Sequence, residues 1–311
     1  MGAQRPKGAL LGVDLGGTQV KAALFSHLGE REAVARAASP SRESAEAILG
    51  AVLAAARELG EPPAGVGVGV AGVLDLREGR VVQSPNLPPL SGFPLRERLR
   101  SALGGVPVQM MNDANAAALG EFHAGAGQAC RSMVLLTLGT GIGGGVVLDG
   151  KIWEGAAGAA GEVGHMCVQA DGPECSCGGR GCLEACVSGW ALVRDAKAAA
   201  RDPASAIASL PELTAERLAG LALAGDAGAR ALWENAGRML GIGVANLMNL
   251  LNPECIVLAG GLARAGDLLL APARRAWEHQ AFERARASCQ VRLASLGEWA
   301  GVRGAIQPFL P

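Results

Sequence analysis

The feature that most constrains the fold is a repeated pattern of apolar strand, glycine-rich turn and apolar strand. The first copy runs from Ala9 through Asp14-Leu15-Gly16-Gly17-Thr18 to Phe25. The second copy runs from Met133 through Thr137-Leu138-Gly139-Thr140-Gly141 to Val147. Because a supersecondary unit that recurs in one chain indicates duplication, we predict two related α/β half-domains.

Both glycine-rich turns are candidate phosphate-binding sites. A turn of glycines exposes backbone N–H groups with no Cβ in the way, so it suits a phosphate. A single turn of this kind is more often only a tight hairpin, whereas two facing turns would grip a chain of phosphates from both sides. Thr137 stands in the second copy where the first has Asp14. Only the first copy therefore offers a carboxylate for a metal ion or its water shell.

The composition favours a globular protein with a tightly packed core. Half of the 311 residues are hydrophobic, only 3% are aromatic and none is Tyr, so the core must consist of Ala, Leu and Val. The net charge of −1 argues against a general nucleic-acid or membrane surface. Residues 1–7 do not resemble a secretory signal, and no segment is as apolar as a membrane helix. We therefore expect a reduced, cytoplasmic protein, whose thiols outside the main cluster are small buried hydrophobes: Cys130, Cys167, Cys186, Cys255 and Cys289.

Apolar periodicity and capping signals place the remaining elements. We predict strands at 66–70, 106–111, 256–259 and 291–294. We predict helices at 41–59, 94–103, 114–122, 188–201, 215–223, 227–251 and 301–309. Two Pro-containing segments, 83–89 and 202–211, are expected to be loops. These elements alternate along the chain as in an α/β protein.

One loop, from Gly161 to Glu184, carries a candidate zinc site. It holds His165 and the pattern Cys-x-Cys-x4-Cys, formed by Cys175, Cys177 and Cys182. Three thiols and an imidazole are a complete tetrahedral set for structural zinc and leave no position for a reacting water. Small buried cysteines or a disulfide pair are the simpler alternative, but they do not explain this spacing in a Gly-rich segment. Glu162 and Glu184 flank the cluster, and carboxylates suit a ligand rich in hydroxyl groups.

Three further positions have both a structural and a functional interpretation. Asp113 lies between a strand and a helix, where Asp is a favoured N-cap but where α/β proteins also place ligand chemistry. Asn86 is the best polar candidate in the loop at 83–89, since binding residues concentrate on loops. The pair Gly260-Gly261 follows a strand and would seat the base or ribose of a nucleotide, although a close helix–strand turn explains it equally well.

Taken together, these motifs resemble the ROK family of sugar kinases, particularly its bacterial ATP-dependent glucokinases, over nearly the whole chain. The resemblance rests on six segments in order: Asp14-Leu15-Gly16-Gly17-Thr18, Gly69-Val70-Ala71-Gly72, Asn112-Asp113-Ala114-Asn115, Leu138-Gly139-Thr140-Gly141-Ile142-Gly143-Gly144-Gly145, Gly161-Glu162-Val163-Gly164-His165 and Cys175 to Glu184. It implies a two-domain actin-like ATPase (ribonuclease H-like) fold with duplicated half-domains and an active-site cleft between them. The expected domains are 1–117 with 298–311, and 118–297, the second carrying the zinc loop.

The resemblance also implies a role for each matching residue. Asp113 would be the general base that takes the proton from the 6-hydroxyl of glucose. His165 would bind structural zinc with Cys175, Cys177 and Cys182 and face the sugar with its other ring nitrogen. The implied sugar contacts are Gly72, Asn86, Asn112, Asp113, Glu162, His165 and Glu184. The implied contacts of ATP and its Mg²⁺ are Asp14, Gly16, Gly17, Thr18, Lys21, Gly139, Thr140, Gly141, Gly260 and Gly261.

Several alternatives stay open at this point. N-acetylglucosamine, N-acetylmannosamine or mannose would replace glucose if the loops around the site differ, and polyphosphate would replace ATP. Relatives of this kind are commonly homodimers or homotetramers. A DNA-binding repressor of the same family is disfavoured because eight residues precede the first strand and the charge provides no DNA-binding face. A zinc-containing sugar sensor without turnover is disfavoured because Asp14, Asp113 and both turns are present. Cys186, close to Glu184, is left out of the metal set.

Overall fold

The computed structural model describes residues 8–60, 62–200 and 205–310, and their contacts divide the chain into two units. Unit 1 comprises Met1–Ala129, Gly145–Gly161 and Ser295–Pro311, and unit 2 comprises Cys130–Gly144 and Glu162–Ala294. The division predicted from the sequence, at 117/118, cuts through helix α3 (Asp113–Ala124), whereas the contacts keep all of α3 in unit 1. Residues 1–7 and the start of the connector predicted at 202–211 lie outside the described residues.

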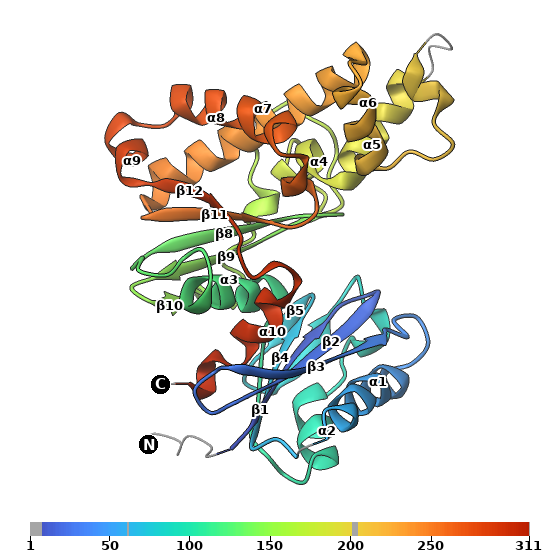
Figure 1. Cartoon of the computed structure of the whole chain (residues 1–311), viewed down its shortest axis with the longest axis vertical. Helices are drawn as coiled ribbons and strands as arrows, with labels where there is room; N and C mark the ends of the chain where they lie inside the picture. Colours follow the sequence, from blue (N-terminus) through green and yellow to red (C-terminus); the bar gives the residue numbers. More distant parts are fainter. Residues whose placement is uncertain (1–7, 61, 201–204, 311) are drawn as a thin grey trace. The chain divides into compact units, whose positions relative to one another are not determined.

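Unit 1 is built on a five-stranded sheet with the order β3-β2-β1-β4-β7 (Figure 1). Its strands are β1 (Leu10–Leu15), β2 (Gln19–Phe25), β3 (Arg31–Ala38), β4 (Gly65–Val70) and β7 (Val108–Asn112). β1 pairs antiparallel with β2 and parallel with β4. α1 (Ala45–Glu58) and α2 (Leu95–Ala102) pack on one face, and α3 and α10 (Ala300–Ala305) pack on the other. The small hairpin of β5 (Val73–Asp75) and β6 (Arg80–Gln83) follows β4.

The glycines of β4 explain how α10 comes so close to this sheet. The strand reads Gly-Val-Gly-Val-Gly-Val, and its valines point into the core formed with α1. A Cβ on Gly67 would overlap the carbonyl oxygen of Ala305, and one on Gly12 of β1 would overlap that of Val302. Alternating Gly and Val therefore gives the sheet one face for side-chain packing and one for close backbone approach.

The second sheet has the order β10-β9-β8-β11-β12 and repeats the topology of the first. Its strands are β8 (Met133–Leu138), β9 (Ile142–Leu148), β10 (Lys151–Ile152), β11 (Cys255–Ala259) and β12 (Gln290–Leu293). In both sheets the first strand of the glycine hairpin has a parallel neighbour, β4 beside β1 and β11 beside β8. The duplication predicted from the two glycine-rich turns is therefore confirmed.

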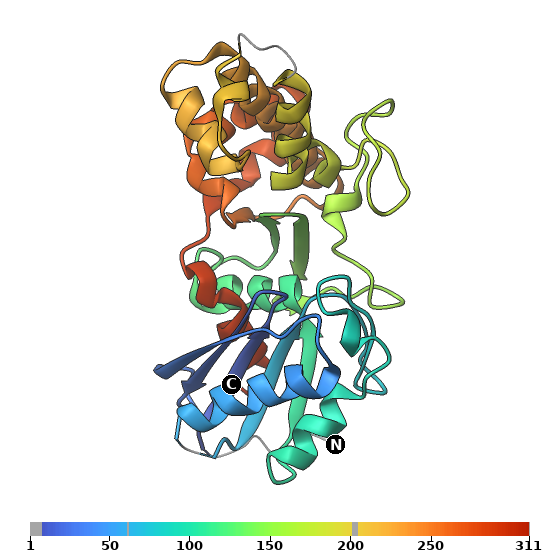
Figure 2. The same cartoon turned by 90° about the vertical axis from the view of Figure 1, so that its right-hand side faces the viewer.

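The helices of unit 2 cover the second sheet (Figure 2). They are α4 (Leu183–Val187), α5 (Gly189–Ala199), α6 (Ala215–Leu223), α7 (Ala227–Leu251), α8 (Asp267–Gln280) and α9 (Glu283–Ser288). The longest, α7, begins at the N-cap Asp226 and ends at Asn252, whose left-handed backbone (φ 43°) precedes Pro253 and stops the helix. Short 3₁₀ turns lie at Pro88–Leu90, Val163–His165, Ala206–Ser209, Leu262–Ala265, Gly297–Trp299 and Gln307–Phe309.

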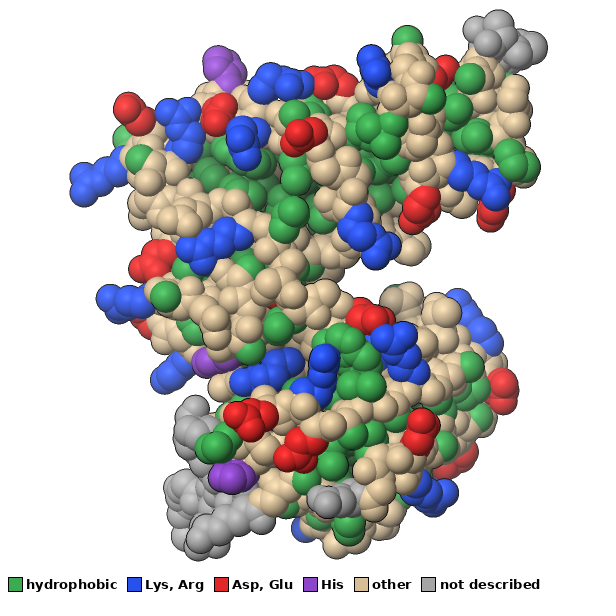
Figure 3. Space-filling model, viewed as in Figure 1, with side chains coloured by type: hydrophobic (Ala, Val, Ile, Leu, Met, Phe, Trp, Pro, Cys, Tyr) green, Lys and Arg blue, Asp and Glu red, His purple; other side chains and the backbone are tan. Residues whose placement is uncertain are grey.

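Basic and acidic side chains are interspersed over the visible face of each unit (Figure 3). Within the described part of the chain, no helix combines the length and the apolar character that crossing a membrane requires.

Candidate active site

The first glycine-rich turn joins β1 to β2 and gathers the predicted phosphate and magnesium residues of unit 1. The N–H of Gly16 donates to the carbonyl of Gln19 (3.1 Å), which closes the turn. Asp14 and Lys21 are cross-strand partners, and the Lys21 Nζ lies 3.5 Å from Asp14 Oδ2. Burial raises the pKa of the Asp14 carboxyl, and the charge of Lys21 opposes this shift. A metal ion near Asp14 would favour the ionised carboxylate that burial disfavours.

The loop at 83–89 packs against this turn through its backbone. A Cβ on Gly17 would lie 2.9 Å from the carbonyl oxygen of Asn86, so only glycine fits there. The side chain of Asn86 is exposed. The structure therefore places this predicted sugar contact beside the first turn.

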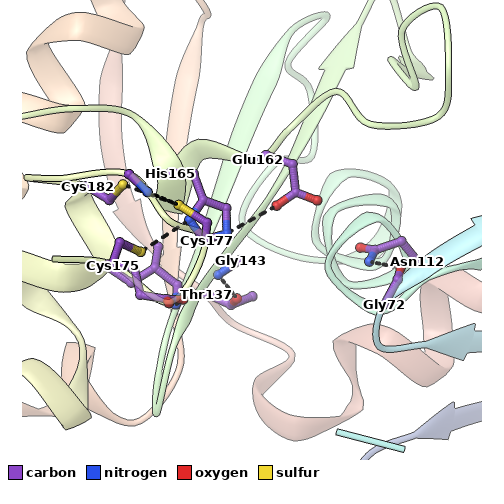
Figure 4. A network of polar contacts seen from close by, with 12 residues as sticks. Gly72, Asn112, Thr137, Gly143, Glu162, His165, Cys175, Cys177 and Cys182 are labelled. Atoms are coloured by element: carbon purple, nitrogen blue, oxygen red, sulfur yellow. Dashed lines mark hydrogen bonds and ion pairs between the residues drawn. The ribbon is translucent and has the colours of Figure 1, made fainter. Parts of the chain in front are cut away.

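The start of α3 organises the predicted base. The N-cap of α3 is Asn112, whose Oδ1 accepts from the N–H groups of Ala114 (2.9 Å) and Asn115 (3.2 Å). Its Nδ2 donates to the carbonyl of Gly72 (3.2 Å; Figure 4). Asp113 is the first helical residue, and its Oδ1 accepts from the N–H of Ala114 at 2.9 Å. The interpretation of Asp113 as the N-cap is therefore wrong, because the preceding Asn112 fills that position.

The second glycine-rich turn joins β8 to β9 in unit 2 and is held by two side chains. The N–H of Gly139 donates to the carbonyl of Gly141 (3.0 Å), two residues further on, whereas Gly16 in the first copy donates to Gln19, three residues further on. Thr137 Oγ1 accepts from the N–H of Gly143 (3.1 Å; Figure 4). Glu184 Oε2 accepts from the N–H of Ile142 (2.8 Å), and a Cβ on Gly141 would lie 2.6 Å from the same oxygen. The glycine thus makes room for the carboxylate of Glu184.

The predicted zinc ligands converge in unit 2. One ligand atom from each of His165, Cys175, Cys177 and Cys182 lies within 4.8 Å of all the others. The Cys177 and Cys182 sulfurs are 3.7 Å apart, and Cys175 Sγ is 3.6 Å from His165 Nδ1 (Figure 4). A tetrahedral zinc ion with ordinary bond lengths requires separations of about 3.8 Å and about 3.5 Å for these pairs. The donor set and its geometry therefore fit zinc.

The two ring nitrogens of His165 face different partners. Nδ1 points into the thiol cluster, and Nε2 lies 3.9 Å from Glu162 Oε2. A metal-binding imidazole is commonly oriented by a carboxylate on its other nitrogen. Glu162 is 61% exposed, so its carboxylate is also accessible to a ligand.

The thiols of the cluster differ in their surroundings. Burial raises the pKa of Cys182 to about 12. The backbone N–H of Gly179 lowers the pKa of Cys177. Because zinc binds thiolates, metal binding must displace the proton of the buried Cys182. Cys186 lies apart from the set, with its sulfur 4.0 Å from Gln169 Oε1.

A pocket of about 950 Å³ in unit 2 opens beside the second turn. Gly139, Thr140 and Gly261, predicted from the sequence, contribute to its lining, together with residues of α5 and α6. The α5 wall was not predicted from the sequence; it consists of Trp190, Val193, Arg194 and Lys197. The i, i+3, i+4, i+7 spacing of these residues was the signal that marks one face of a helix.

Two residues at the edges of this pocket have structural roles. Gly260 is not among its lining residues. The backbone of Gly260 is left-handed (φ 94°), and a Cβ at this position would overlap the carbonyl of Leu138. Glycine therefore allows β11 to end close beside β8. The guanidinium of Arg194 lies over the ring of Trp190, 5.2 Å from its centroid, which is within the range of a cation–π contact. Arg194 also donates to the carbonyl of Ala185 (2.9 Å), which fixes this wall.

Comparison with known proteins gives consistent matches over almost the whole chain. The model of the ROK family matches residues 10–309. A glucokinase from Halalkalibacterium halodurans is 37% identical over 309 residues, which cover 94% of this chain and 92% of the relative. The structure of a ROK hexokinase from Thermus thermophilus is 38% identical, with a TM-score of 0.80 and 96% of each chain covered. A ROK family glucokinase from Streptomyces griseus in complex with glucose and AMPPNP is 35% identical, with a TM-score of 0.80, and the match covers 96% of this chain and 98% of the other.

Proposed function

Because the chain belongs to the ROK family, we propose that it transfers the γ-phosphate of ATP to the 6-hydroxyl of glucose. The chain is an ATP-dependent sugar kinase with the two-domain actin-like fold. The observation that carries the finer proposal is the position of Glu184. Its carboxylate holds the second glycine-rich turn, and it follows the last zinc-type cysteine by two residues.

In this proposal, unit 2 binds ATP through the second turn and the adjoining pocket. The backbone N–H groups of Gly139, Thr140 and Gly141 suit the phosphates, since turns of this kind bind anions. The pocket of about 950 Å³ is large enough for a nucleoside. Gly261 and Trp190 would flank the base or ribose, and Lys197 and Arg194 supply positive charge at the wall.

The first turn would contribute to the phosphates from unit 1. Gly16, Gly17 and Thr18 offer backbone N–H groups, and Lys21 offers a cation. Asp14 would hold Mg²⁺ through its water shell. When bound, the magnesium ion neutralises phosphate charge. In such a reaction most of the catalysis comes from positioning and electrostatics.

The sugar would be held by carboxylates and the oriented imidazole. Glu162 and Glu184 accept hydrogen bonds from sugar hydroxyls, and His165 is fixed between the cluster and Glu162. Zinc would bind to His165, Cys175, Cys177 and Cys182 and order the segment that carries both glutamates. In unit 1, Asn112 keeps one N–H of its amide for a hydroxyl beyond its contact with Gly72.

Asp113 would act as the general base. Its Oδ1 accepts a hydrogen bond from the Ala114 N–H in the first turn of α3, which orients the carboxylate. The carboxylate would accept the proton of the 6-hydroxyl as the oxygen attacks the γ-phosphate. A weak base suffices because the transition state is loose and the proton leaves late.

The test is ADP release in the presence of ATP and a panel of glucose, mannose, N-acetylglucosamine and N-acetylmannosamine. We expect sugar-dependent ADP release with the highest kcat/KM for glucose. Mixtures without sugar measure hydrolysis, and polyphosphate in place of ATP measures donor choice. A preference for a 2-acetamido sugar would replace glucose in the proposal. The absence of any sugar-dependent release would contradict it.

A further inference from the structure

Glu121 is a buried carboxylate that the proposed reaction does not use. It lies on α3 in unit 1, about two helical turns after Asp113. The residue is fully buried, with 0% of its surface exposed, so it cannot touch a substrate. A buried carboxylate is costly unless hydrogen bonds or a charge compensate for the loss of water. The side chain therefore needs partners inside the protein.

The partners of Glu121 belong to two separate segments. In the turn after α3, the N–H of Ala126 donates to Glu121 Oε2 (2.8 Å). In the segment before α10, the N–H of Leu296 donates to Oε1 (2.7 Å), and the N–H of Ser295 lies 3.1 Å from both oxygens. The Ser295 hydroxyl donates to Oε2 (3.3 Å). All of these partners are donors, which matches a carboxylate that only accepts hydrogen bonds.

The turn after α3 is shaped around this carboxylate. The N–H groups of Gly125 (3.0 Å) and Gly127 (2.8 Å) donate to the main-chain carbonyl of Glu121. A Cβ on Gly125 would overlap Glu121 Oε2, so a side chain there would displace the carboxylate. Glu121 therefore holds this turn with its backbone and its side chain together.

Both segments lie directly beside a passage of the chain between the two units. One passage follows Ala129, where the first segment of unit 1 ends, and another precedes Ser295, where its last segment begins. A third passage precedes Gly145, which also rests on α3, because a Cβ there would overlap that of Ala118. Segments that join two domains and absorb their rotation act as hinges. Glu121 thus binds two candidate hinge segments to one helix.

On the basis of the proposed kinase function, we propose that Glu121 is a positioning residue that anchors the hinge between the two units. Its carboxylate keeps both segments attached to α3, the helix that begins with the proposed base Asp113. Unit 2, which would carry ATP, then moves about points that are fixed relative to this base. Closure of this kind excludes water and completes the reacting arrangement. A purely structural clamp would stabilise the fold without affecting the closure.

The experiment compares the full-length unchanged chain with Glu121→Gln, whose amide keeps the shape but presents a donor to N–H groups. Small-angle X-ray scattering measures the radius of gyration alone and with glucose plus a non-hydrolysable ATP analogue. We expect the ligands to decrease this radius in the unchanged chain and to decrease it less in Glu121→Gln. We also expect kcat to fall about 10- to 100-fold, because misplacement far from the chemistry is costly. The Kd of the ATP analogue should stay within about twofold, because the proposed ATP site lies in unit 2.

A second variant reaches the same carboxylate without changing a charge. Gly125→Ala should show the same loss of kcat at unchanged affinity for the ATP analogue, and it carries the test if Glu121→Gln does not fold. Because both substitutions act on one carboxylate, the double variant should lose less than the product of the two single losses. Gln128→Ala changes an exposed side chain of the same turn and should keep the kinetics of the unchanged chain.

Three results would overturn the inference. The first is that folded Glu121→Gln and Gly125→Ala keep the kcat of the unchanged chain. The second is that they lose turnover while the ligands decrease their radius of gyration as before, which would make Glu121 a structural clamp only. The third is an active unchanged chain whose radius of gyration does not respond to the ligands. An unchanged chain that releases no ADP with any sugar would instead contradict the proposed kinase function.

Discussion

The Oε2 atom of Glu184 lies 2.8 Å from the backbone nitrogen of Ile142. This hydrogen bond joins α4, which begins directly after Cys182, to the second glycine-rich turn. The same oxygen occupies the space that a Cβ on Gly141 would need. A displacement of the candidate zinc loop therefore reaches the second glycine-rich turn through one side chain, so the loop and the turn are coupled within unit 2.

Removal of the Glu184 carboxylate should weaken the phosphate turn. Glu184→Ala leaves the Ile142 N–H without its acceptor, and a hydrogen bond to a charged group contributes about 1.5–3 kcal/mol. We expect kcat/KM for ATP and glucose to fall about 10- to 100-fold while the zinc content stays unchanged. Glu174→Ala, an exposed glutamate of the same loop that pairs with Arg180, is the matched control and should keep its activity. Equal kinetics of the two variants would contradict the coupling.

The metal should be required for activity although it takes no part in the chemistry. Cys182→Ser replaces a buried ligand, and we expect loss of bound zinc by elemental analysis, a lower melting temperature and loss of sugar-dependent ADP release. Cys167→Ser changes an exposed thiol of the same loop outside the metal set and should retain zinc. Full turnover of Cys182→Ser without bound zinc would contradict the proposal that zinc is required for activity.

Asp113 should be needed for turnover and dispensable for folding. Asp113→Asn keeps an acceptor for the Ala114 N–H but removes the base, so we expect kcat to fall about 10²- to 10⁴-fold. Glucose affinity, measured by calorimetry, should stay within about threefold, because the reacting proton contributes little to ground-state binding. Asp267→Asn, in the first turn of α8, is the control. An Asp113→Asn variant with normal turnover would remove Asp113 from the catalytic role.

The half-buried Asp14 should lower the stability of the ligand-free protein at neutral pH. Its pKa is raised in the fold above the ordinary value of 3.8, so folding favours the protonated form. The stabilising contribution is present below that ordinary value and is lost as pH rises through the raised pKa. Asp14→Asn should therefore melt at a higher temperature than the unchanged chain at pH 7, with the difference vanishing in acid. Turnover should be lost in the same variant. A lower melting temperature at pH 7 would show that the Lys21 contact dominates.

Lys197 should contribute to nucleotide affinity. It lies on the α5 wall of the pocket and is exposed, so it adds a screened positive charge near the nucleotide. We predict that Lys197→Ala raises KM for ATP about 3- to 10-fold with kcat nearly unchanged, as expected for uniform binding. Lys151→Ala, on β10 and outside the pocket lining, serves as the control. A fall in kcat at unchanged KM would assign Lys197 a role in the transition state instead.

The architecture could be predicted from the sequence because the sequence contains two copies of one strand, glycine-rich turn and strand pattern. The two glycine-rich turns indicated the duplication, and the apolar runs around them correspond to β1, β2, β8 and β9. It did not predict β3, whose Arg-Glu-Ala-Val-Ala-Arg pattern is largely exposed at the sheet edge and turns only small side chains, Ala35 and Ala37, toward the core. Nor did it delimit α8, which contains Pro272, a residue that ordinarily ends a helix. The ring of Pro272 packs against Gly237 of α7, in the space that a Cβ at Gly237 would occupy.

The sequence predicted which residues belong to the site, and the structure shows which groups those residues contact. Spacing along the loop was enough to group His165 with the three cysteines, because metal ligands leave a local pattern. The contact between Glu184 and Ile142 spans far-separated segments and leaves no such pattern. The N-cap was assigned to Asp113 because Asn and Asp are both favoured at that position. Only the backbone of α3 shows that Asn112 is the cap.

The most direct test of the proposed reaction is to identify the phosphorylated hydroxyl. The protein is incubated with ATP, Mg²⁺ and glucose, and the product is analysed by ³¹P–¹H correlation NMR. We predict that the unchanged chain yields a phosphate coupled to the two protons on C6 of glucose, and that Asp113→Asn forms this product at a strongly reduced rate. A phosphate on another carbon, or ADP formed without any phosphorylated sugar, would contradict it.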